Sequence, residues 1–303
     1  SGTLTGLDVK VHRIDGPGDS EWPEPRTIEG KKTRKLQAVL DDTVDSGGQI
    51  LIFVNSRASA QKEARELAKH VAKESNKNSS RYSEEMVEEW DYISKKLTQR
   101  ENMSAMGRAL ANSVKGGIAF HHAGLTFAQR KTIEDSFRNG TLLAIVATPT
   151  LAQGVNLPAR RVIVRDYRRW SSVAGGSMPV PVMEVRQMLG RAGRPRYDNA
   201  GDAWIIAKDN DEELNLVDRY LLSDAEEVTS KLANPSALRP EEDPALLTHV
   251  LSIIATSGIR DRDALSRFFG ETFLATQIES DTLESRIDDV VSWLTINEMI
   301  TRM

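Results

Sequence analysis

The sequence predicts an α/β domain, with a parallel sheet and helices on both of its faces, followed by a mostly helical domain. Between residues 31 and 208, short apolar segments alternate with amphipathic ones, which is the pattern of βαβ units. After Asp209 only helical periodicity remains until close to the end of the chain. A chain of 303 residues has room for two domains. We therefore expect a lead-in at residues 1–30, the first domain at 31–210 and the second at 211–303.

The first domain begins with a helix, a buried strand and a second helix. Residues 34–46 have helical spacing and end at Gly47. The continuous apolar run at 49–55 is typical of a buried parallel strand. Ser56 can cap the strongly amphipathic helix that we expect at 57–75.

The rest of the first domain continues the alternation. The polar, charged residues 76–112, which include Trp90, Tyr92 and Ile93, predict one or two surface helices. The segment "GIAFHHAGL" indicates a short strand that runs into a glycine turn. Further strands are expected at 142–148, 160–167 and 201–208, and helices at 126–140 and from 182 into a glycine loop near 190.

The second domain is expected to consist of small helices with a β segment at the end of the chain. The ending "WLTINEMITRM" indicates a helix followed by a short strand. Several small helices and a terminal strand pair suit a winged-helix domain. The helices are expected at 211–222, 244–257, 260–269 and 281–294.

The composition is that of an ordinary globular protein, with 39% hydrophobic residues and a formal net charge of -4. No apolar run is long enough to cross a membrane, and the first residues do not resemble a signal peptide, so we expect a cytoplasmic protein. The chain has no cysteine and five scattered histidines, which excludes disulfides and thiolate zinc sites. We expect no metal held by this chain.

The charge is distributed unevenly along the chain. Between Leu157 and Tyr197 lie nine arginines, no lysine and two acidic residues, a formal charge of +7. From Asp209 to Met303 there are 20 acidic and 8 basic residues, a formal charge of -12. Guanidinium groups pair with phosphate oxygens in bidentate geometry, so this arginine block can face phosphates. A solvated positive face, or one paired with the acidic second half, explains the charge equally well.

Four motifs occur in a fixed order: "LIFVNSR" at 51–57, "HHAGL" at 121–125, "IVATPTLAQGVNLPARRVI" at 145–163 and "QMLGRAGRPRYD" at 187–198. In order and spacing they resemble the motifs of the second motor domain of superfamily-two helicases, and most closely those of the Ski-like branch. The later segments "SKLANPSALR", "HVLSIIATSG" and "LSRFFGETFLATQ" are similar to the winged-helix domain of archaeal HelQ-type (Hjm) DNA helicases. The resemblance implies a RecA-like first domain and a winged-helix second domain.

The resemblance assigns one set of residues to ATP. It implies that Arg191 and Arg194 are arginine fingers, which reach the γ-phosphate of ATP across a cleft between two motor domains and stabilise the charge that develops there. Gln187 resembles the glutamine that couples the nucleotide and nucleic-acid sites, although an exposed helix residue is the alternative. Gly154 and Asn156 are expected toward ATP. Many relatives outside this branch have aspartate at the position of Asn156.

A second set is assigned to nucleic acid. Thr148 follows a buried strand and resembles a contact to the nucleic-acid backbone, while a helix cap is its alternative role. The residues expected beside it are Asn55, Ser56, Arg57, His122 and Gly124. We reject acid–base catalysis and metal binding by His121 and His122, since the sequence offers no third ligand or carboxylate constellation nearby.

The segment from 165 to 182 has strand-like ends around Gly175 and Gly176, which indicates a β-hairpin. In the HelQ-type enzymes a hairpin at this place separates the strands of a duplex. The resemblance therefore places Tyr167, Arg168, Arg169 and Trp170 on a strand-separating hairpin, with an aromatic ring able to stack on a base pair. A surface hairpin whose aromatic rings pack on the sheet is the alternative.

The sequence contains no P-loop, because its nearest approach, "EGKKT" at 29–33, lacks the first glycine of that motif. ATP and Mg²⁺ are therefore expected to bind mainly to a first motor domain outside this chain, without which the chain is expected to be inactive. The resemblance implies an ATP-dependent 3′ to 5′ DNA helicase, active in fork repair and recombination on single-stranded and forked DNA. A Ski-like RNA helicase and a non-catalytic binding module remain alternatives. We expect this chain to be monomeric.

Overall fold

The computed structural model describes residues 7–9, 26–76, 81–98, 104–171, 175–193, 201–224, 229–234, 237–259 and 261–301. The chain divides into two compact units, Ser1–Glu226 and Glu227–Met303. The first unit extends beyond the boundary expected near residue 210, because α8 (Asn210–Leu216) and the π-helix after it, η2 (Val217–Leu222), bury Leu216 and Tyr220 in its core.

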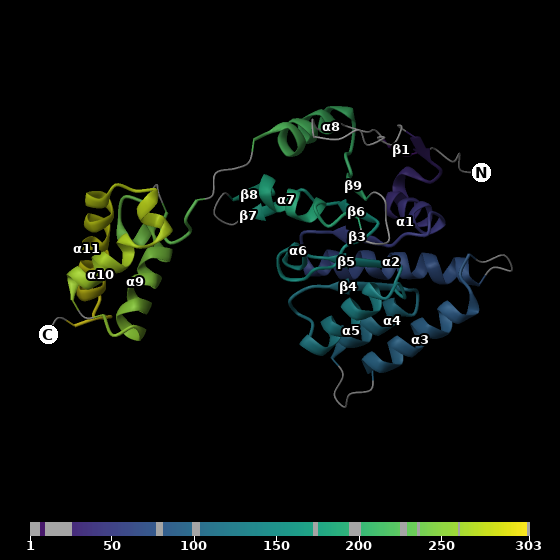
Figure 1. The fold of residues 1–303 in the computed structure, drawn as a ribbon, viewed down its shortest axis with the longest axis horizontal. Coiled ribbons are helices and arrows are strands. Elements are labelled where there is room, and N and C mark those ends of the chain that lie inside the picture. Colours follow the sequence, from purple (N-terminus) through teal and green to yellow (C-terminus); the bar gives the residue numbers. More distant parts are fainter. Residues whose placement is uncertain are drawn as a thin grey trace. The chain divides into compact units, whose positions relative to one another are not determined.

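The centre of the first unit is a parallel sheet of five strands in the order β4-β5-β3-β6-β9. Figure 1 shows α3, α4 and α5 gathered beside the β4 edge and α8 beside the β9 edge. All four residues of β3, β4, β5 and β6 are buried, as expected for strands covered on both sides. The predicted parallel sheet is thus confirmed. Its strands are β3 (Ile50–Phe53), β4 (Ile118–His121), β5 (Ala144–Ala147), β6 (Arg161–Val164) and β9 (Asp202–Ile205).

The register aligns the carboxyl ends of these strands. Phe53 lies opposite Ala147 on one side and opposite Val164 on the other. His121, the last residue of β4, also lies opposite Ala147. The loops that follow β3, β4 and β5 therefore open at the same edge of the sheet.

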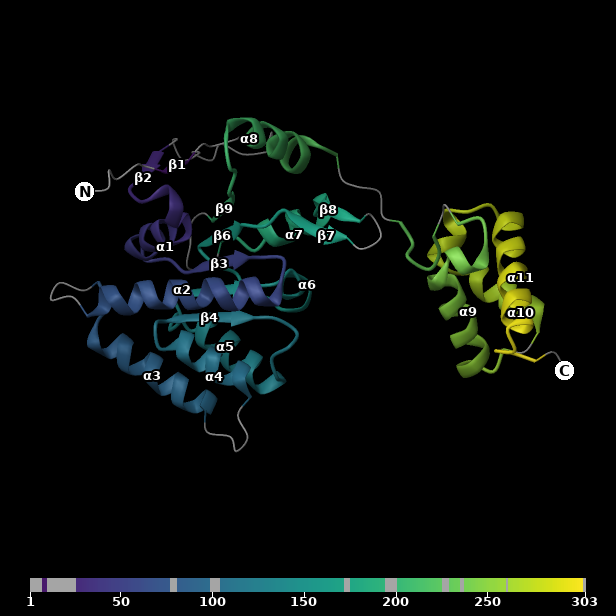
Figure 2. The same cartoon turned by 180° about the vertical axis from the view of Figure 1, so that it is seen from behind.

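Helices connect and cover the strands, as Figure 2 shows from behind. The side chain of Ser56 accepts a hydrogen bond from the Ser59 amide and caps α2 at the predicted residue. A reciprocal capping box between Thr126 and Gln129 starts α5. These helices are α1 (Lys35–Asp45), α2 (Arg57–Ser75), α3 (Glu84–Thr98), α4 (Ala105–Val114), α5 (Phe127–Arg138), α6 (Thr150–Gly154) and α7 (Val182–Leu189). A short antiparallel pair, β1 (Leu7–Val9) and β2 (Arg26–Ile28), precedes them.

Helix α3 is more than the surface helix that its polar sequence indicated. Trp90 is only 1% exposed, and its indole Nε1 donates a hydrogen bond of 2.8 Å to the carbonyl of Thr141. The ring covers Gly117, whose φ is +68° and where a Cβ atom would lie 2.6 Å from the indole. Ile93 is also buried, whereas Tyr92 is exposed. Helix α3 is therefore amphipathic, and its apolar face, with Trp90 and Ile93, packs against the core.

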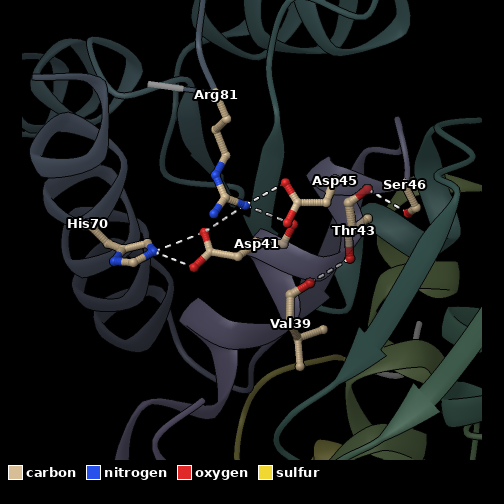
Figure 3. Close-up of polar contacts among 7 residues, drawn as sticks. All are labelled: Val39, Asp41, Thr43, Asp45, Ser46, His70 and Arg81. Carbon is tan, nitrogen blue, oxygen red and sulfur yellow. Dashed lines mark hydrogen bonds and ion pairs between the residues drawn. The ribbon is translucent and has the colours of Figure 1, made fainter. Parts of the chain in front are cut away.

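Charged side chains join α1 to α2 and to the residues before α3 (Figure 3). His70 on α2 lies 2.9 Å from a carboxylate oxygen of Asp41 on α1. Arg81 donates a hydrogen bond of 2.7 Å to Asp45 and also faces Asp41. This network fixes the chain where it enters α3.

A buried arginine joins the amino ends of β6 and β9 to α1. Arg161 is 2% exposed. Its guanidinium donates a 2.6 Å hydrogen bond to Asp42 and a 3.0 Å hydrogen bond to Asp202. The guanidinium carbon also lies 3.8 Å from the centre of the Trp204 ring, and Thr43 accepts a further hydrogen bond of 2.7 Å. This one buried cation therefore contacts two carboxylates on different elements.

In the part of the second unit that the structure describes, the regular elements are all helices. Its core gathers around the buried side chains of Val250, Phe269, Ile287 and Leu294. The predicted strand at the end of the chain is wrong as far as Thr301, since the residues after the last helix form turns. The helices are η3 (Pro240–Glu242), α9 (Pro244–Thr256), α10 (Arg262–Gly270), η4 (Phe273–Thr276) and α11 (Ser280–Ile296).

The first prediction concerns Arg161. Replacing it with methionine, which fills similar space without a charge, should lower the free energy of unfolding of the first unit by about 3 kcal/mol, because the buried ion pairs of Arg161 with Asp42 and Asp202 are lost. Urea unfolding followed by tryptophan fluorescence measures this change. Arg138→Met, at an exposed pair with Asp135, is the matched control and should leave the unfolding curve nearly unchanged. Equal stability of the two variants would contradict the role given to Arg161.

A second buried ionisable group lies at the other end of the sheet. His121 is 4% exposed, and its Nε2 lies 2.8 Å from Glu134 on α5. Burial lowers the pKa of His121 below the ordinary value of 6.5, although the hydrogen bond to Glu134 acts in the opposite direction. Burial also lowers the pKa of its neighbour His122. The unfolded chain therefore binds these protons more tightly than the folded chain.

We expect the free energy of unfolding of the first unit to fall as the pH is lowered from about 7.5 to about 5.5. The reason is that the two histidines bind protons more weakly in the folded chain, so unfolding takes up protons. His121→Gln should reduce this fall, since glutamine does not titrate. Urea unfolding at the two pH values gives the comparison. The exposed His249 on α9 provides the control, and His249→Gln should keep the full pH dependence. A fall of undiminished size in His121→Gln would show that the burial of this ring is not its cause.

Candidate functional site

Three loops that carry predicted nucleic-acid contacts meet at the carboxyl edge of the sheet. The Val54 amide donates to the carbonyl of Ala147 at 2.9 Å, which joins the ends of β3 and β5. The Thr148 amide donates to the carbonyl of His121 at 3.1 Å, which joins the ends of β5 and β4. The structure thus brings these three motifs together.

The turn after β4 presents its backbone to solvent. His122 is fully buried, and its Nδ1 accepts a 3.1 Å hydrogen bond from the Gly124 amide. Its Nε2 lies 3.2 Å from the Gln61 side-chain amide, and its ring stacks on Phe120. The His122 ring is therefore turned into the protein, and the predicted contact of His122 with nucleic acid stays a prediction. The imidazole shapes the turn, and leaves Gly124 exposed.

The Arg57 guanidinium lies beside this turn. A Cβ atom added to Gly124 would lie 3.5 Å from Nη1 of Arg57 and 3.1 Å from the His122 ring. Arg57 is the first residue of α2 and is exposed. The exposed guanidinium of Arg57 and the exposed backbone of Gly124 therefore lie side by side. A larger side chain in place of Gly124 would come between them.

The hydroxyl groups of Thr148 and Ser56 in these loops form hydrogen bonds within the protein. Thr148 is only 9% exposed, and its hydroxyl lies 3.0 Å from that of Thr150. The Ser56 hydroxyl caps α2 and bonds to the Ser59 hydroxyl at 2.9 Å. Thr148 does not cap α6, for which no side-chain cap is formed. Of its two predicted roles, the helix cap is absent from this structure.

Asn55 faces the protein and not the open edge. Its side-chain amide donates to the carbonyl of Arg168, and its backbone amide donates to Asp166 at 3.1 Å. Arg165 holds that carboxylate at 2.7 Å and pairs with Glu63 on α2, also at 2.7 Å. Asn55 therefore ties the loop after β3 to the segment that leads from β6 into the hairpin.

The hairpin predicted between 165 and 182 is present. β7 (Arg168–Ser171) pairs antiparallel with β8 (Gly176–Pro179), and Gly175 has a φ of +62° at the turn. Trp170 is 73% exposed. Tyr167 is half-buried against the core, and burial together with the nearby Glu212 raises its pKa. Trp170, and not Tyr167, is thus the aromatic ring that this hairpin offers to solvent.

The hairpin arginines are held against their own domain. Arg168 donates a 2.6 Å hydrogen bond to the carbonyl of Ser177 across the hairpin. Arg169 pairs with Glu184 on α7 at 2.9 Å. The first contact joins the two strands of the hairpin, and the second joins the hairpin to α7.

The residues predicted to face ATP gather at the end of α7. Arg191 donates to the carbonyl of Ala152 and, at 3.3 Å, to Oδ1 of Asn156. Ala152, Gln187, Gly190 and Arg191 line a shallow depression. Gly154 ends α6 nearby in the chain, and the Gln187 side chain is exposed. Arg194 lies outside the described residues.

Sequence reasoning missed the contacts that hold α7 in place. Glu184 lies on the same helix as Gln187 and holds the hairpin. Arg186 donates to backbone carbonyls of the segment that leads out of the first unit. Helical periodicity places these side chains on different sides of α7, but only the folded chain shows what each one meets.

No group of acidic residues and histidines suited to hold a metal occurs among the residues that the structure describes. Within the same residues, no helix has both the length and the apolarity to cross a membrane.

Comparison with known proteins relates this geometry to helicases. Residues 82–196 match the family described as Helicase conserved C-terminal domain. The chain is 40% identical over 281 residues to ATP-dependent DNA helicase Hel308 of Methanocella arvoryzae, which covers 91% of this chain and 35% of the relative.

Proteins of the same name from two other organisms give similar matches. For Pyrobaculum calidifontis, the identity is 36% over 297 residues, covering 97% of this chain and 37% of the relative. For Pyrococcus horikoshii, the identity is 36% over 280 residues, covering 92% of this chain and 36% of the relative. The chain therefore spans 35 to 37% of the length of these relatives. The parallel sheet, the domain match and these relatives together support the assignment of the chain to the Ski-like superfamily-two helicases, as a fragment whose first unit contains a RecA-like helicase C-terminal domain.

Proposed function

We propose that this chain is one half of the motor of an ATP-dependent DNA helicase. The observation that carries the proposal is the gathering of Arg57, Gly124 and Thr148 at one edge of the sheet, on loops that follow three neighbouring strands. Phosphates are commonly held by guanidinium groups and hydroxyls of this kind. The relatives named ATP-dependent DNA helicase support DNA as the nucleic acid that is bound and ATP as the nucleotide that is hydrolysed.

The ATP side of the proposal rests on Arg191. Its guanidinium is held by an uncharged amide oxygen and a backbone carbonyl, and among the residues that the structure describes no carboxylate pairs with it. A phosphate is a stronger partner for a guanidinium than either group, so Arg191 can turn toward ATP held by a first motor domain. There it would act as an arginine finger together with Arg194, while Gly154 and Asn156 would line the nucleotide. ATP with Mg²⁺ supplies the phosphoryl transfer that drives movement.

The strand-separating part of the proposal rests on the hairpin. Trp170 is exposed beside two arginines that are fixed by contacts to Ser177 and Glu184. A rigid hairpin with an exposed indole can stack on the last base pair of a duplex while the motor draws one strand past it. We propose movement from 3′ to 5′ on forked DNA, in repair and recombination.

Binding of single-stranded DNA tests the nucleic-acid half of this proposal. Fluorescence anisotropy across a salt series should show binding that weakens with salt, and Arg57→Gln should reduce the slope of log K against log salt by about 0.7. Thr148→Ala should also weaken binding. Arg138→Gln, on the exposed end of α5, is the matched control and should leave both affinity and slope unchanged.

The same titration separates the alternatives. Contacts to the phosphate backbone do not distinguish the two sugars, so tighter binding to matched RNA than to DNA would require a contact to the 2′-hydroxyl. That result would favour an RNA helicase. An unchanged slope in Arg57→Gln would contradict the proposed site. Absence of binding to any of these strands at low salt would favour the non-catalytic module.

ATP hydrolysis tests the other half. Adding a first motor domain to this chain should produce DNA-stimulated ATPase activity, and Arg191→Gln should lower its kcat by about 10³. Arg138→Gln should retain full activity. Restored hydrolysis that is insensitive to Arg191→Gln would remove Arg191 from the proposed role.

A further inference from the structure

Helix α7 contacts three separate parts of the first unit. Glu184 meets the hairpin, and Gln187 lines the depression next to Arg191. Arg186 meets the exit segment, which we define as residues 217–224, the last described residues before the second unit. One short helix therefore links the proposed ATP side, the hairpin and the connection to the second unit. Both Figure 1 and Figure 2 show α7 next to the hairpin strands β7 and β8.

The contact between Arg186 and the exit segment is a guanidinium fork on backbone carbonyls. Nε donates to Tyr220 at 3.1 Å, and Nη2 donates to Leu221 at 3.4 Å and to Ser223. The carbonyls of Tyr220 and Leu221 lie in the last turn of a helix and that of Ser223 directly follows it, where the helix carries its negative dipole charge. A planar cation with several donors satisfies them in a way that a single ammonium group does not.

The exit segment has an unusual conformation that requires such support. Val217–Leu222 (η2) is a π-helix, and the Ser223 amide bonds to the carbonyl of Asp218 at 2.9 Å. π-Helices are rare because their geometry is less favourable than that of α-helices, and they are frequent at functional sites. Leu222 is 62% exposed, so packing of its outer side does not hold the segment in place.

Besides Arg186, Tyr220 attaches the exit segment to the first unit. Its side chain is 1% exposed, and its hydroxyl lies 2.9 Å from the carbonyl of Val180 and 3.2 Å from that of Tyr167. Val180 and Tyr167 flank the hairpin and do not belong to α7. Tyr220 thus anchors the segment to the base of the hairpin, and Arg186 anchors it to α7.

We propose that Arg186 is a positioning residue that couples α7 to the second unit through the exit segment. The guanidinium makes the last turn before the connection move with α7, so that a displacement of the Gln187–Arg191 loop is passed on to the second unit. Tyr220 alone leaves this turn attached but free to pivot about the hairpin base. The proposal concerns the connection between the units and stands independently of whether the chain binds DNA or ATP.

The experiment uses the absence of cysteine from the whole chain. A single cysteine in place of the exposed Ser252 on α9 carries a fluorophore, and time-resolved anisotropy reports the segmental motion of the second unit. Backbone hydrogen exchange between Val217 and Ser223 reports the exit segment itself. Both measurements are made on the complete 303-residue chain.

In Arg186→Gln we expect exchange in the exit segment to become at least ~10-fold faster, together with a larger amplitude of segmental motion of the second unit. Arg186→Lys, which keeps the charge without the fork, should fall between wild type and Arg186→Gln. The matched control is Arg219→Gln, because Arg219 lies on the same segment but places its guanidinium 5.7 Å from the Tyr220 ring centre. It should behave like wild type in both measurements.

Faster exchange without increased motion of the second unit would overturn the proposal, because Arg186 would then have only a local structural role. Unchanged exchange in Arg186→Gln would overturn it as well. Unchanged exchange within β3 and β5 shows that the variant remains folded. If Arg186→Gln unfolds, Arg186→Lys decides the outcome: intermediate exchange and motion support the proposal, and wild-type values of both contradict it.

Discussion

The candidate site depends on the parallel register of the central sheet. Because β3, β4, β5 and β6 end at the same level, every loop that follows them is delivered to one edge. The wholly buried strands fix this register, since a slip would displace each apolar side chain from its packing partner. The loops are short, so the site inherits its geometry from the core. Contacts such as that between Thr148 and His121 then join one loop to the next.

The nine arginines between Leu157 and Tyr197 show that a high formal charge in the sequence does not predict a positively charged exposed surface. Arg161 is buried between two aspartates, and Arg165 lies between Glu63 and Asp166. Arg169 and Arg186 are held by a carboxylate and by helix-end carbonyls. Much of the +7 charge is therefore used to connect elements within the domain. Among the described arginines of this block, Arg191 has uncharged partners and lies on the proposed ATP side, so it can exchange those partners for a phosphate.

Much of the fold could be predicted from the sequence because apolar runs and caps act locally. Helix α2 begins and ends where the pattern placed it, and Ser56 caps it. The hairpin followed from two glycines between strand-like segments. The end of the first unit could not be found in this way, because Tyr220 is drawn into the core by carbonyls about forty to fifty residues earlier in the chain. The terminal strand was wrong because a short apolar ending does not reveal whether a pairing partner exists.

The site was predictable as a set of motifs but not as a set of side-chain directions. The motifs meet as expected, yet the His122 ring is turned into the core and the Asn55 amide is turned toward Arg168. Such directions depend on partners like Gln61 and Asp166 that lie on other elements. For the same reason Arg186 was unremarkable in the sequence, since its partners are carbonyls and carry no signature of their own.

The central claim is that nucleic acid lies along the carboxyl edge of the sheet. Backbone hydrogen exchange of the chain, with and without saturating single-stranded DNA, tests it most directly. The account predicts slower exchange on binding in the loops at 54–57, 122–126 and 148–151. It predicts no change at the opposite edge, at 46–49, 115–117 and 141–143. Protection confined to the opposite edge or to the second unit would contradict the account.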